Sequence, residues 1–408
     1  MVWRTQQEDR LWAQLELDHA RTVFLDRDGV FSKGGRWKTL KMLLGEGMLT
    51  SDGEPWRRKR RVVEPAFHRS QLSQLTTMMA DTTETMVDAW RAHARRDAPI
   101  NVAPWMMELA LEIVVRALFS SDISSEVKTI STSFMTAQNY ISRITWDPIA
   151  RVRSHLPSRR RRRFRHAVQT LDRIVFDLLN ARRTSETSRG DLLDMILTAS
   201  GEDVEKPLSD RELRDEVLTL MIAGHETTAN ALAWTWYMLS TYPDAARAIR
   251  TEVNQVLGKR RDIQFGDVQQ LHWTRRVVQE VMRLYPPLWF LPRSVERPTR
   301  IGDVFVPQGS MVFVSPYVLH HDARYWNNPM GFDPARFQAR PKPYTYLPFG
   351  MGPRTCIGRS FALMELTLIV ALVVRAFDIA LVPGQQVVPT TLLTLRPRRG
   401  VHVQLKEV

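Results

Sequence analysis

The stretch Phe349-Gly-Met-Gly-Pro-Arg-Thr-Cys-Ile-Gly358 carries the strongest signal in this sequence. It contains Cys356, the single cysteine among 408 residues. Gly350 and Gly352 allow the backbone to turn tightly ahead of the thiol. Gly358, which has no side chain, leaves room for the next segment to approach a flat bound group. The stretch therefore predicts a loop that presents one thiol.

A helix is predicted to begin near Arg359, directly after this loop. Its free amides and the positive end of its dipole would stabilise a thiolate at Cys356, and Phe349 is expected to pack beside the sulfur and keep water away. The alternative is a buried structural cysteine beside a glycine loop. A structural cysteine would not by itself require glycines at 350, 352 and 358 and an aromatic residue at 349.

The loop resembles the signature of the cytochrome P-450 family of haem-thiolate monooxygenases, and the resemblance extends over nearly the whole chain. It implies a mainly α fold, a many-helix bundle with small β-sheets. Haem b would lie between a long central helix and the helix that follows the cysteine loop. Cys356 would be the axial iron ligand, with Phe349 and Gly358 beside the cofactor. We expect residues 1–408 to form one catalytic domain.

The long central helix is predicted from Ser209-Asp-Arg-Glu212, which has the form of a capping box, to about Pro243. Apolar periodicity predicts further helices over 71–94 and 164–183 and a buried helix over 106–119. Short β-type runs at 304–306, 311–314 and 401–405 predict a small sheet and a closing strand.

Ala223-Gly-His-Glu-Thr-Thr228 lies in the middle of the central helix. Glycine in a helix centre costs about 1 kcal/mol relative to alanine, so a sequence that keeps it there uses the distortion. Ala223 and Gly224 would leave a groove for O2 beside the haem. Glu226 and Thr227 would form an acid and alcohol pair that relays protons, while His225 packs on the other side. The alternative is a helix crossing point where small residues allow close packing.

Further site residues follow from the resemblance. Glu280 and Arg283, one helical turn apart, would join Arg336 to hold the core near the cysteine loop. Haem propionates would be bound by Arg293, Arg354, Trp56 and Arg60, because the planar guanidinium of arginine suits a carboxylate.

The substrate is expected to be a hydrophobic small molecule, because the candidate pocket residues are all apolar. They are Leu43, Leu44, Met48, Leu288, Phe290, Leu291, Leu392 and Leu393. The same residues could equally be ordinary core.

The expected reaction inserts one oxygen atom of O2 into a C–H or C=C bond. Electrons would come from a ferredoxin or flavodoxin with its reductase, so that NAD(P)H is used only indirectly. The resemblance suggests Arg57, Arg58, Lys59, Arg61, Arg340 and Lys342 as cationic docking candidates, with ordinary solvated surface charge as the alternative. A peroxide-driven hydroxylase or haem isomerase would lack the Glu226–Thr227 pair, and a haem sensor or carrier would not need it.

The composition constrains the setting. A single cysteine excludes an intrachain disulfide and fits a reducing cytoplasm, and no apolar run is long enough to span a membrane. We expect a cytoplasmic monomer without a transmembrane segment. The family has strands and a helix ahead of Ala20, where this chain offers about twenty residues, so its front is expected to be shortened.

The formal net charge is +13. Zinc-ligand clusters and aromatic-basic RNA signatures are absent from the sequence, so no nucleic-acid partner is expected. The run of arginines at 159–163 is interpreted as a solvated loop and helix start, with contact to a membrane surface or a partner as the alternative.

Overall fold

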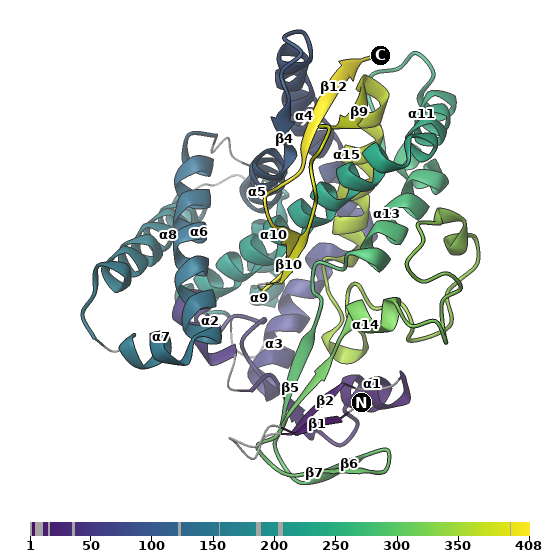
Figure 1. Cartoon of the computed structure of the whole chain (residues 1–408). Coiled ribbons are helices and arrows are strands. Elements are labelled where there is room, and N and C mark those ends of the chain that lie inside the picture. Colours follow the sequence, from purple (N-terminus) through teal and green to yellow (C-terminus); the bar gives the residue numbers. More distant parts are fainter. Residues whose placement is uncertain are drawn as a thin grey trace. The chain divides into compact units, whose positions relative to one another are not determined.

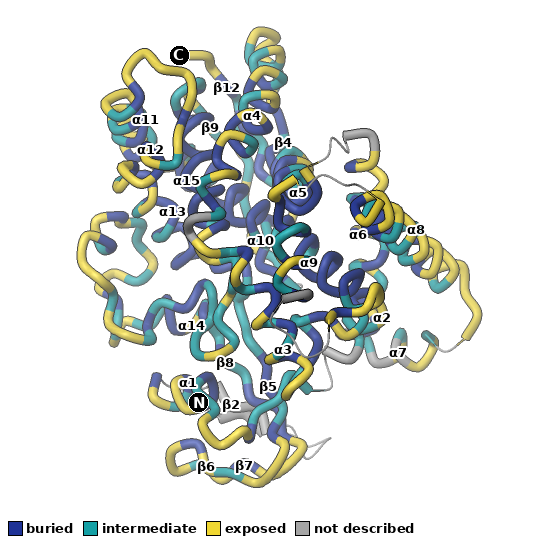
Figure 2. The backbone as a smooth tube through the Cα atoms, turned by 180° about the vertical axis from the view of Figure 1, so that it is seen from behind, coloured by how far each residue is buried: buried dark blue, intermediate teal, exposed yellow. Residues whose placement is uncertain are grey.

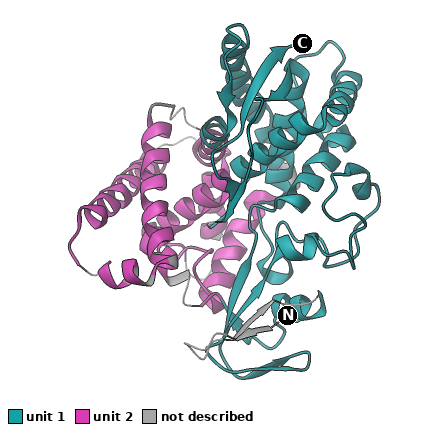
Figure 3. Ribbon diagram, viewed as in Figure 1, with its two compact units in different colours: residues 1–32, 72–109, 227–408 teal, residues 33–71, 110–226 magenta. Residues whose placement is uncertain are grey.

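The computed structural model describes residues 2–4, 11–14, 17–34, 37–120, 124–154, 156–184, 189–202, 207–391 and 393–408. Figure 3 shows the two compact units of the chain. Unit 1 comprises residues 1–32, 72–109 and 227–408, and unit 2 comprises residues 33–71 and 110–226.

Helices make up most of the described residues, as the apolar periodicity predicts (Figure 1). They are α1 (Leu17–Leu25), α2 (Trp37–Leu44), α3 (Gly53–Val63), α4 (Arg69–Ala94), α5 (Val102–Phe119), α6 (Ser124–Trp146), α7 (Pro148–Arg153), α8 (Arg159–Arg183), α9 (Leu192–Glu202), α10 (Asp210–Thr241), α11 (Pro243–Leu257), α12 (Phe265–Gln270), α13 (His272–Leu284), α14 (Pro316–His320) and α15 (Arg359–Ala376). Short 3-10 turns are η1 (Glu64–Phe67), η2 (Pro334–Gln338) and η3 (Gly352–Arg354).

The predicted central helix is α10, and its predicted ends are confirmed. The Ser209 hydroxyl accepts a hydrogen bond from the Glu212 amide (3.3 Å), and the Glu212 carboxylate accepts one from the Ser209 amide (3.0 Å). This capping box satisfies two free amides at the helix start. The helix continues for 32 residues, and Pro243 then begins α11.

All strands of the described chain belong to unit 1. They are β1 (Val2–Arg4), β2 (Leu11–Gln14), β3 (Phe31–Ser32), β4 (Ile100–Asn101), β5 (Leu291–Val295), β6 (Thr299–Ile301), β7 (Val304–Val306), β8 (Met311–Val314), β9 (Phe377–Leu381), β10 (Pro389–Thr391), β11 (Leu395–Pro397) and β12 (His402–Glu407).

The largest sheet has the order β1-β2-β8-β5-β3, in which only β2 and β8 run parallel. The predicted runs at 304–306 and 311–314 are strands, but they belong to different sheets: β8 lies in the five-stranded sheet, and β7 pairs with β6 in a hairpin. The predicted closing strand is β12, between β4 and β9. The front of the chain contributes β1 and β2 to the main sheet.

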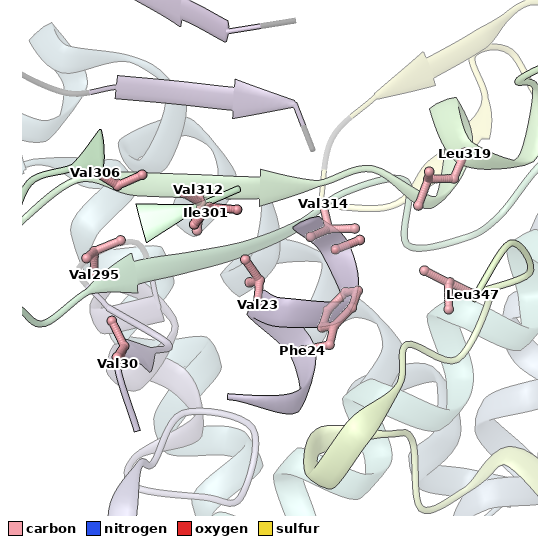
Figure 4. Packing of buried hydrophobic residues seen from close by; sticks show 11 residues of the cluster. Val23, Phe24, Val30, Val295, Ile301, Val306, Val312, Val314, Leu319 and Leu347 are labelled. Atoms are coloured by element: carbon pink, nitrogen blue, oxygen red, sulfur yellow. The ribbon is translucent and has the colours of Figure 1, made fainter. Parts of the chain in front are cut away.

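A hydrophobic cluster in unit 1 joins α1 to the main sheet (Figure 4). Val23 and Phe24 of α1 pack with Val312 and Val314 of β8, and Leu347 belongs to the same cluster. Burying a side chain of this size contributes about 2 kcal/mol. Leu347 lies two residues before Phe349, so the cluster anchors the chain as it enters the cysteine loop.

In unit 2, α8 packs one face against α6, where the rings of Tyr140 and Phe164 stack with centroids 4.6 Å apart. The buried residues of α8 recur at three- and four-residue steps, beginning with Phe164, Ala167 and Leu171. Its opposite face is exposed (Figure 2).

Candidate active site

Cys356 lies in unit 1 between η3 and the first turn of α15, as predicted, and is exposed. Backbone hydrogen bonds close the loop: the Cys356 amide donates to the Phe349 carbonyl (3.0 Å) and the Gly350 amide to the Leu347 carbonyl (3.1 Å). The loop around the exposed thiol therefore has a defined backbone shape.

Two glycines permit this shape. Gly350 and Gly352 have φ of +66° and +70°, in the left-handed region that disfavours other residues. A Cβ on Gly352 would lie 2.4 Å from the Phe24 carbonyl oxygen of α1. Gly358 has φ of −80°, which any residue adopts, so its expected role beside the cofactor stays a prediction.

Glu280 and Arg283 of α13 form a bidentate ion pair in unit 1, with N–O distances of 2.7 and 2.8 Å, and both side chains are fully buried. Arg336 of η2 donates from Nε to the Glu280 carboxylate (3.2 Å). The structure therefore brings together the three predicted residues.

The same arginine fixes the backbone around it. The Arg283 guanidinium donates to the carbonyls of His320 (2.8 Å), Pro329 (2.6 Å) and Gly331 (2.9 Å). One buried cation thus holds α13, the end of α14 and the segment before η2.

His320 connects this network to the cysteine loop, and the sequence did not single it out. Its Nδ1 lies 3.1 Å from the Arg283 carbonyl, and its Nε2 accepts a hydrogen bond from the Leu347 amide (2.8 Å). Nε2 must therefore be unprotonated and Nδ1 must carry the proton. Burial lowers the pKa of His320 to about 3, which keeps the ring neutral.

The predicted propionate ligands are divided between the units. In unit 1, Arg293 of β5 is buried, with its guanidinium carbon 5.6 Å from the centroid of the Phe24 ring, and Arg354 is half-buried in η3. In unit 2, Trp56 and Arg60 lie on α3, where Arg60 packs over the Trp56 ring and pairs with Glu64 (2.9 Å). That these four residues bind one group stays a prediction.

The centre of α10 differs from the rest of that helix. Ala223 is exposed and Gly224 half-buried, whereas residues 213–221 and 228–236 are buried. A Cβ on Gly224 would lie 2.8 Å from Cγ2 of Val114 on α5. An exposed residue and a close helix contact therefore occur at the same turn, so the groove and the helix crossing point, the two interpretations of the small residues, do not exclude each other.

Glu226 and His225, in this turn, both contact α6. The Glu226 carboxylate is buried in unit 2 and accepts a hydrogen bond from the Gln138 amide of α6. Thr227 is half-buried. His225 bonds to the Met221 carbonyl (3.0 Å) and stacks on Phe134, as expected for a packing residue, and burial lowers its pKa.

A second acid lies beside α10 in unit 1. The Thr228 hydroxyl donates to Oε2 of Glu365 on α15 (3.3 Å). Glu365 is fully buried, which raises its pKa well above the usual range, and its Oε1 has no hydrogen-bond partner among the described residues. The only sequence signal for Glu365 was an acid at the start of a long apolar run.

The candidate pocket residues lie in both units. Leu43 and Leu44 are buried and Met48 is half-buried in unit 2. Leu288, Phe290, Leu291 and Leu393 are half-buried in unit 1, and Leu392 lies outside the described residues.

Two hydrogen bonds place the Leu393 turn near other parts of the site in unit 1. The Asn230 side chain of α10 donates to the Thr394 hydroxyl (3.1 Å), and the Leu395 amide donates to the Pro287 carbonyl (2.9 Å). The turn therefore lies beside α10 and beside the segment that enters β5.

The expected docking surface needs one correction. Lys59 is only 2% exposed and donates to the Glu46 carbonyl, and Arg58 pairs with Glu212. The prediction that Lys59 docks a partner is wrong, because its side chain caps a carbonyl inside unit 2. Arg57, Arg61, Arg340 and Lys342 are exposed.

The family model described as cytochrome P450 matches residues 7–404. The chain belongs to the cytochrome P450 family. This cytochrome P450 is 36% identical over 373 residues to cyclooctatin synthase from Streptomyces melanosporofaciens, a match covering 90% of this chain and 80% of that relative. It is 33% identical over 360 residues to cyclooctat-9-en-7-ol 5-monooxygenase from the same organism, covering 87% and 77%.

The fold of the heme domain of cytochrome P450DA superimposes on this P450 with a TM-score of 0.89 at 23% identity, covering 100% of this chain and 90% of that chain. The predicted fold class is confirmed, and the chain is a cytochrome P450 monooxygenase. Family membership implies a haem-thiolate cofactor, O2 and a source of electrons. No helix among the described residues is long and apolar enough to cross a membrane.

Proposed function

We propose that this P450 binds haem b through the Cys356 thiolate and inserts one oxygen atom of O2 into a C–H or C=C bond of a hydrophobic small molecule. Electrons would come from a ferredoxin or flavodoxin with its reductase. The observation that carries the proposal is the exposed thiol of the chain's single cysteine, held by a glycine loop immediately before α15.

The residues present fit a haem-thiolate site. The Cys356 sulfur precedes a helix N-terminus, where backbone amides favour a thiolate. Arg293, Arg354, Trp56 and Arg60 would hold the propionates, and the haem, when bound, would activate O2. Bidentate arginine contacts suit carboxylates buried away from water.

Proton delivery is assigned to Glu226 and Thr227. The Gln138 amide donates a hydrogen bond to the Glu226 carboxylate and so fixes its position, from which it would pass on a proton. The Thr227 hydroxyl, the next residue on α10, can accept that proton and hand on its own. The Thr228–Glu365 hydrogen bond would hold the following turn in place.

The substrate is proposed to be lipophilic. Leu288, Phe290, Leu291 and Leu393 supply half-buried apolar surface in unit 1, as expected for pocket walls. The two relatives whose names refer to cyclooctatin and to a cyclooctat-9-en-7-ol support a substrate that is largely hydrocarbon.

The absorbance of the reduced, CO-bound protein tests the axial ligand. The spectrum of a thiolate-ligated haem is expected for the native chain and should be lost in Cys356→Ser. A spectrum typical of histidine ligation that is unchanged by the substitution would contradict the proposal.

Oxygenation is tested separately, by NADPH consumption and product formation with a surrogate ferredoxin and reductase. Glu226→Gln and Thr227→Ala are expected to lower the ratio of product to NADPH consumed, because protons then reach the site less effectively. A chain that binds haem and CO but never turns over any of a panel of lipophilic compounds would favour a sensor or carrier.

A further inference from the structure

The segment from α7 into the first turns of α8 has an unusual surface. Residues 148–171 contain eight arginines, at positions 151, 153, 159–163 and 165, and neither Asp nor Glu. Ile149, Val152 and Leu156 in the same segment are 65%, 74% and 61% exposed. Residues 149–165, taken without His155 and without the side chain of Arg151, are called the α7–α8 surface below.

The three exposed apolar side chains lie close together in sequence, between residues 149 and 156. Ile149 and Val152 are three residues apart on α7 and therefore share one face of that helix, and Leu156 follows in the connection to α8. Other exposed large hydrophobic residues of the described chain are isolated in sequence: Met42, Met135, Tyr242, Phe305, Val318, Met330, Val388 and Val408. Clustered exposed apolar residues indicate an interaction surface.

The arginines do not stabilise the helix that carries them. Arg159, Arg160, Arg162 and Arg163 are in the first turns of α8, where positive charges oppose the helix dipole and repel one another. None of the four has an ion pair with a carboxylate in the described part of the chain, and all four are exposed, as is Arg165. Ser158 caps the helix by accepting from the Arg161 amide (3.1 Å), which fixes where the run begins.

We propose that the α7–α8 surface docks this P450 onto an anionic lipid bilayer. The arginines would contact lipid phosphates, and Ile149, Val152 and Leu156 would enter the layer between the headgroups. A bilayer offers an anionic sheet and an apolar interior side by side, which matches both halves of the surface. Nucleic acid offers phosphates without an apolar layer. This interaction goes beyond the proposed oxygenation and does not depend on it.

Co-sedimentation of the haem-loaded full chain with lipid vesicles tests the proposal. Binding is expected to vesicles of equal parts phosphatidylglycerol and phosphatidylcholine, to weaken with salt, and to be lost with phosphatidylcholine alone. Replacing Arg159, Arg160 and Arg162 with Gln should lower the partition by about tenfold or more. Replacing Ile149, Val152 and Leu156 with Ser should lower it by about tenfold as well.

Matched controls separate this surface from net charge and general stickiness. Arg275, Arg398 and Arg399 replaced with Gln remove the same charge elsewhere, and Phe305→Ser with Met330→Ser removes apolar groups that are 58% and 69% exposed. Both controls should bind vesicles like the native chain. An equal loss in the controls would overturn the proposal. The CO-bound spectrum and unfolding temperature of each variant confirm that it is folded.

A second ligand distinguishes a bilayer from any polyanion. The Ile149, Val152 and Leu156 variant should lose vesicle binding and keep whatever affinity the native chain has for double-stranded DNA. If this variant binds the anionic vesicles as tightly as the native chain, the surface is only a polyanion site. Absence of vesicle binding by the native chain at low salt overturns the proposal outright.

Discussion

Arg283 is a buried cation that holds several segments of unit 1 near the cysteine loop. A buried ion pair is stabilising only when geometry and further hydrogen bonds offset the desolvation of both ions. Arg283 meets this condition, because its five donors are used by the Glu280 carboxylate and by three carbonyls. A lysine ammonium, which has three donors on a flexible side chain, could not satisfy the same carboxylate and three carbonyls.

Arg283→Lys is therefore expected to lower the free energy of unfolding by about 3 kcal/mol or more. The variant should also retain less haem after purification, because the cysteine loop is tied to this network through His320. Urea unfolding measures the first effect and the ratio of haem to protein absorbance the second.

Arg324→Lys is the matched control, since Arg324 pairs with Asp322 at the surface (2.7 Å) and should change stability by less than about 1 kcal/mol. If the two substitutions lowered the free energy of unfolding equally, the planar guanidinium of Arg283 would not be needed for stability.

His320 predicts a pH dependence of stability. Its folded pKa of about 3 lies below the unfolded value of 6.5, so the unfolded chain binds a proton that the folded chain does not. The contribution of neutral His320 to the free energy of unfolding is complete above pH 6.5. It is lost as the pH falls toward 3, and the loss reaches up to about 5 kcal/mol.

His320→Gln removes this titration. The native chain should therefore exceed the Gln variant in unfolding free energy by more at pH 7.5 than at pH 5, which urea titrations at the two values measure. A difference that does not change with pH would show that His320 does not titrate on unfolding.

Single residues also show what the sequence could predict. Glu280, Arg283 and Arg336 were found because a family pattern links their types and order. His320 and Gln138 were not, because their partners are distant in sequence: His320 bonds to backbone atoms 37 and 27 residues away, and Gln138 to Glu226, 88 residues away. Lys59 was misplaced because a basic run does not show which of its members points inward.

At the scale of elements, the two ends of α10 could be predicted from the sequence, but the segments that contact it could not. Its capping box and the following proline are local signals, and both were confirmed. The strands at 304–306 and 311–314 were recognised from composition, but the sheet to which each belongs was not. β7 pairs with the neighbouring β6, whereas β8 pairs with β2, about 300 residues away.

Gly224 is the element-scale test. Alanine there would gain about 1 kcal/mol of helix propensity, but its Cβ would lie 2.8 Å from Val114 Cγ2. Overpacking costs about 1 to 3 kcal/mol, so Gly224→Ala should be destabilising by about 1 kcal/mol.

A double-mutant cycle with Val114→Ala checks the cause. The double variant should be more stable than the sum of the two single effects by about 1 kcal/mol, because the clashing methyl groups are gone. Additive effects would show that α5 and α10 relax without strain at this contact.

At the scale of the whole molecule, the net charge of +13 favours an acidic electron donor. Arg57 and Arg61 of α3 are exposed, with side-chain exposures of 65% and 67%. Replacing both with Gln is expected to slow reduction by an acidic ferredoxin by about threefold to tenfold at low salt and to have little effect at high salt.

Stopped-flow reduction of the haem measures this rate. Arg398→Gln with Arg399→Gln is the control, because it removes the same charge from an exposed turn of unit 1. If both pairs slow reduction equally, only the overall field of the molecule guides the donor.

The single cysteine of this chain has a practical consequence. Because Cys356 is the only thiol in the 408 residues, a maleimide reagent can react at one place, and a bound metal would block that reaction. The unreacted fraction therefore counts the molecules that carry cofactor. Loading can be titrated directly in a preparation, without any optical standard, and compared across every substitution described above.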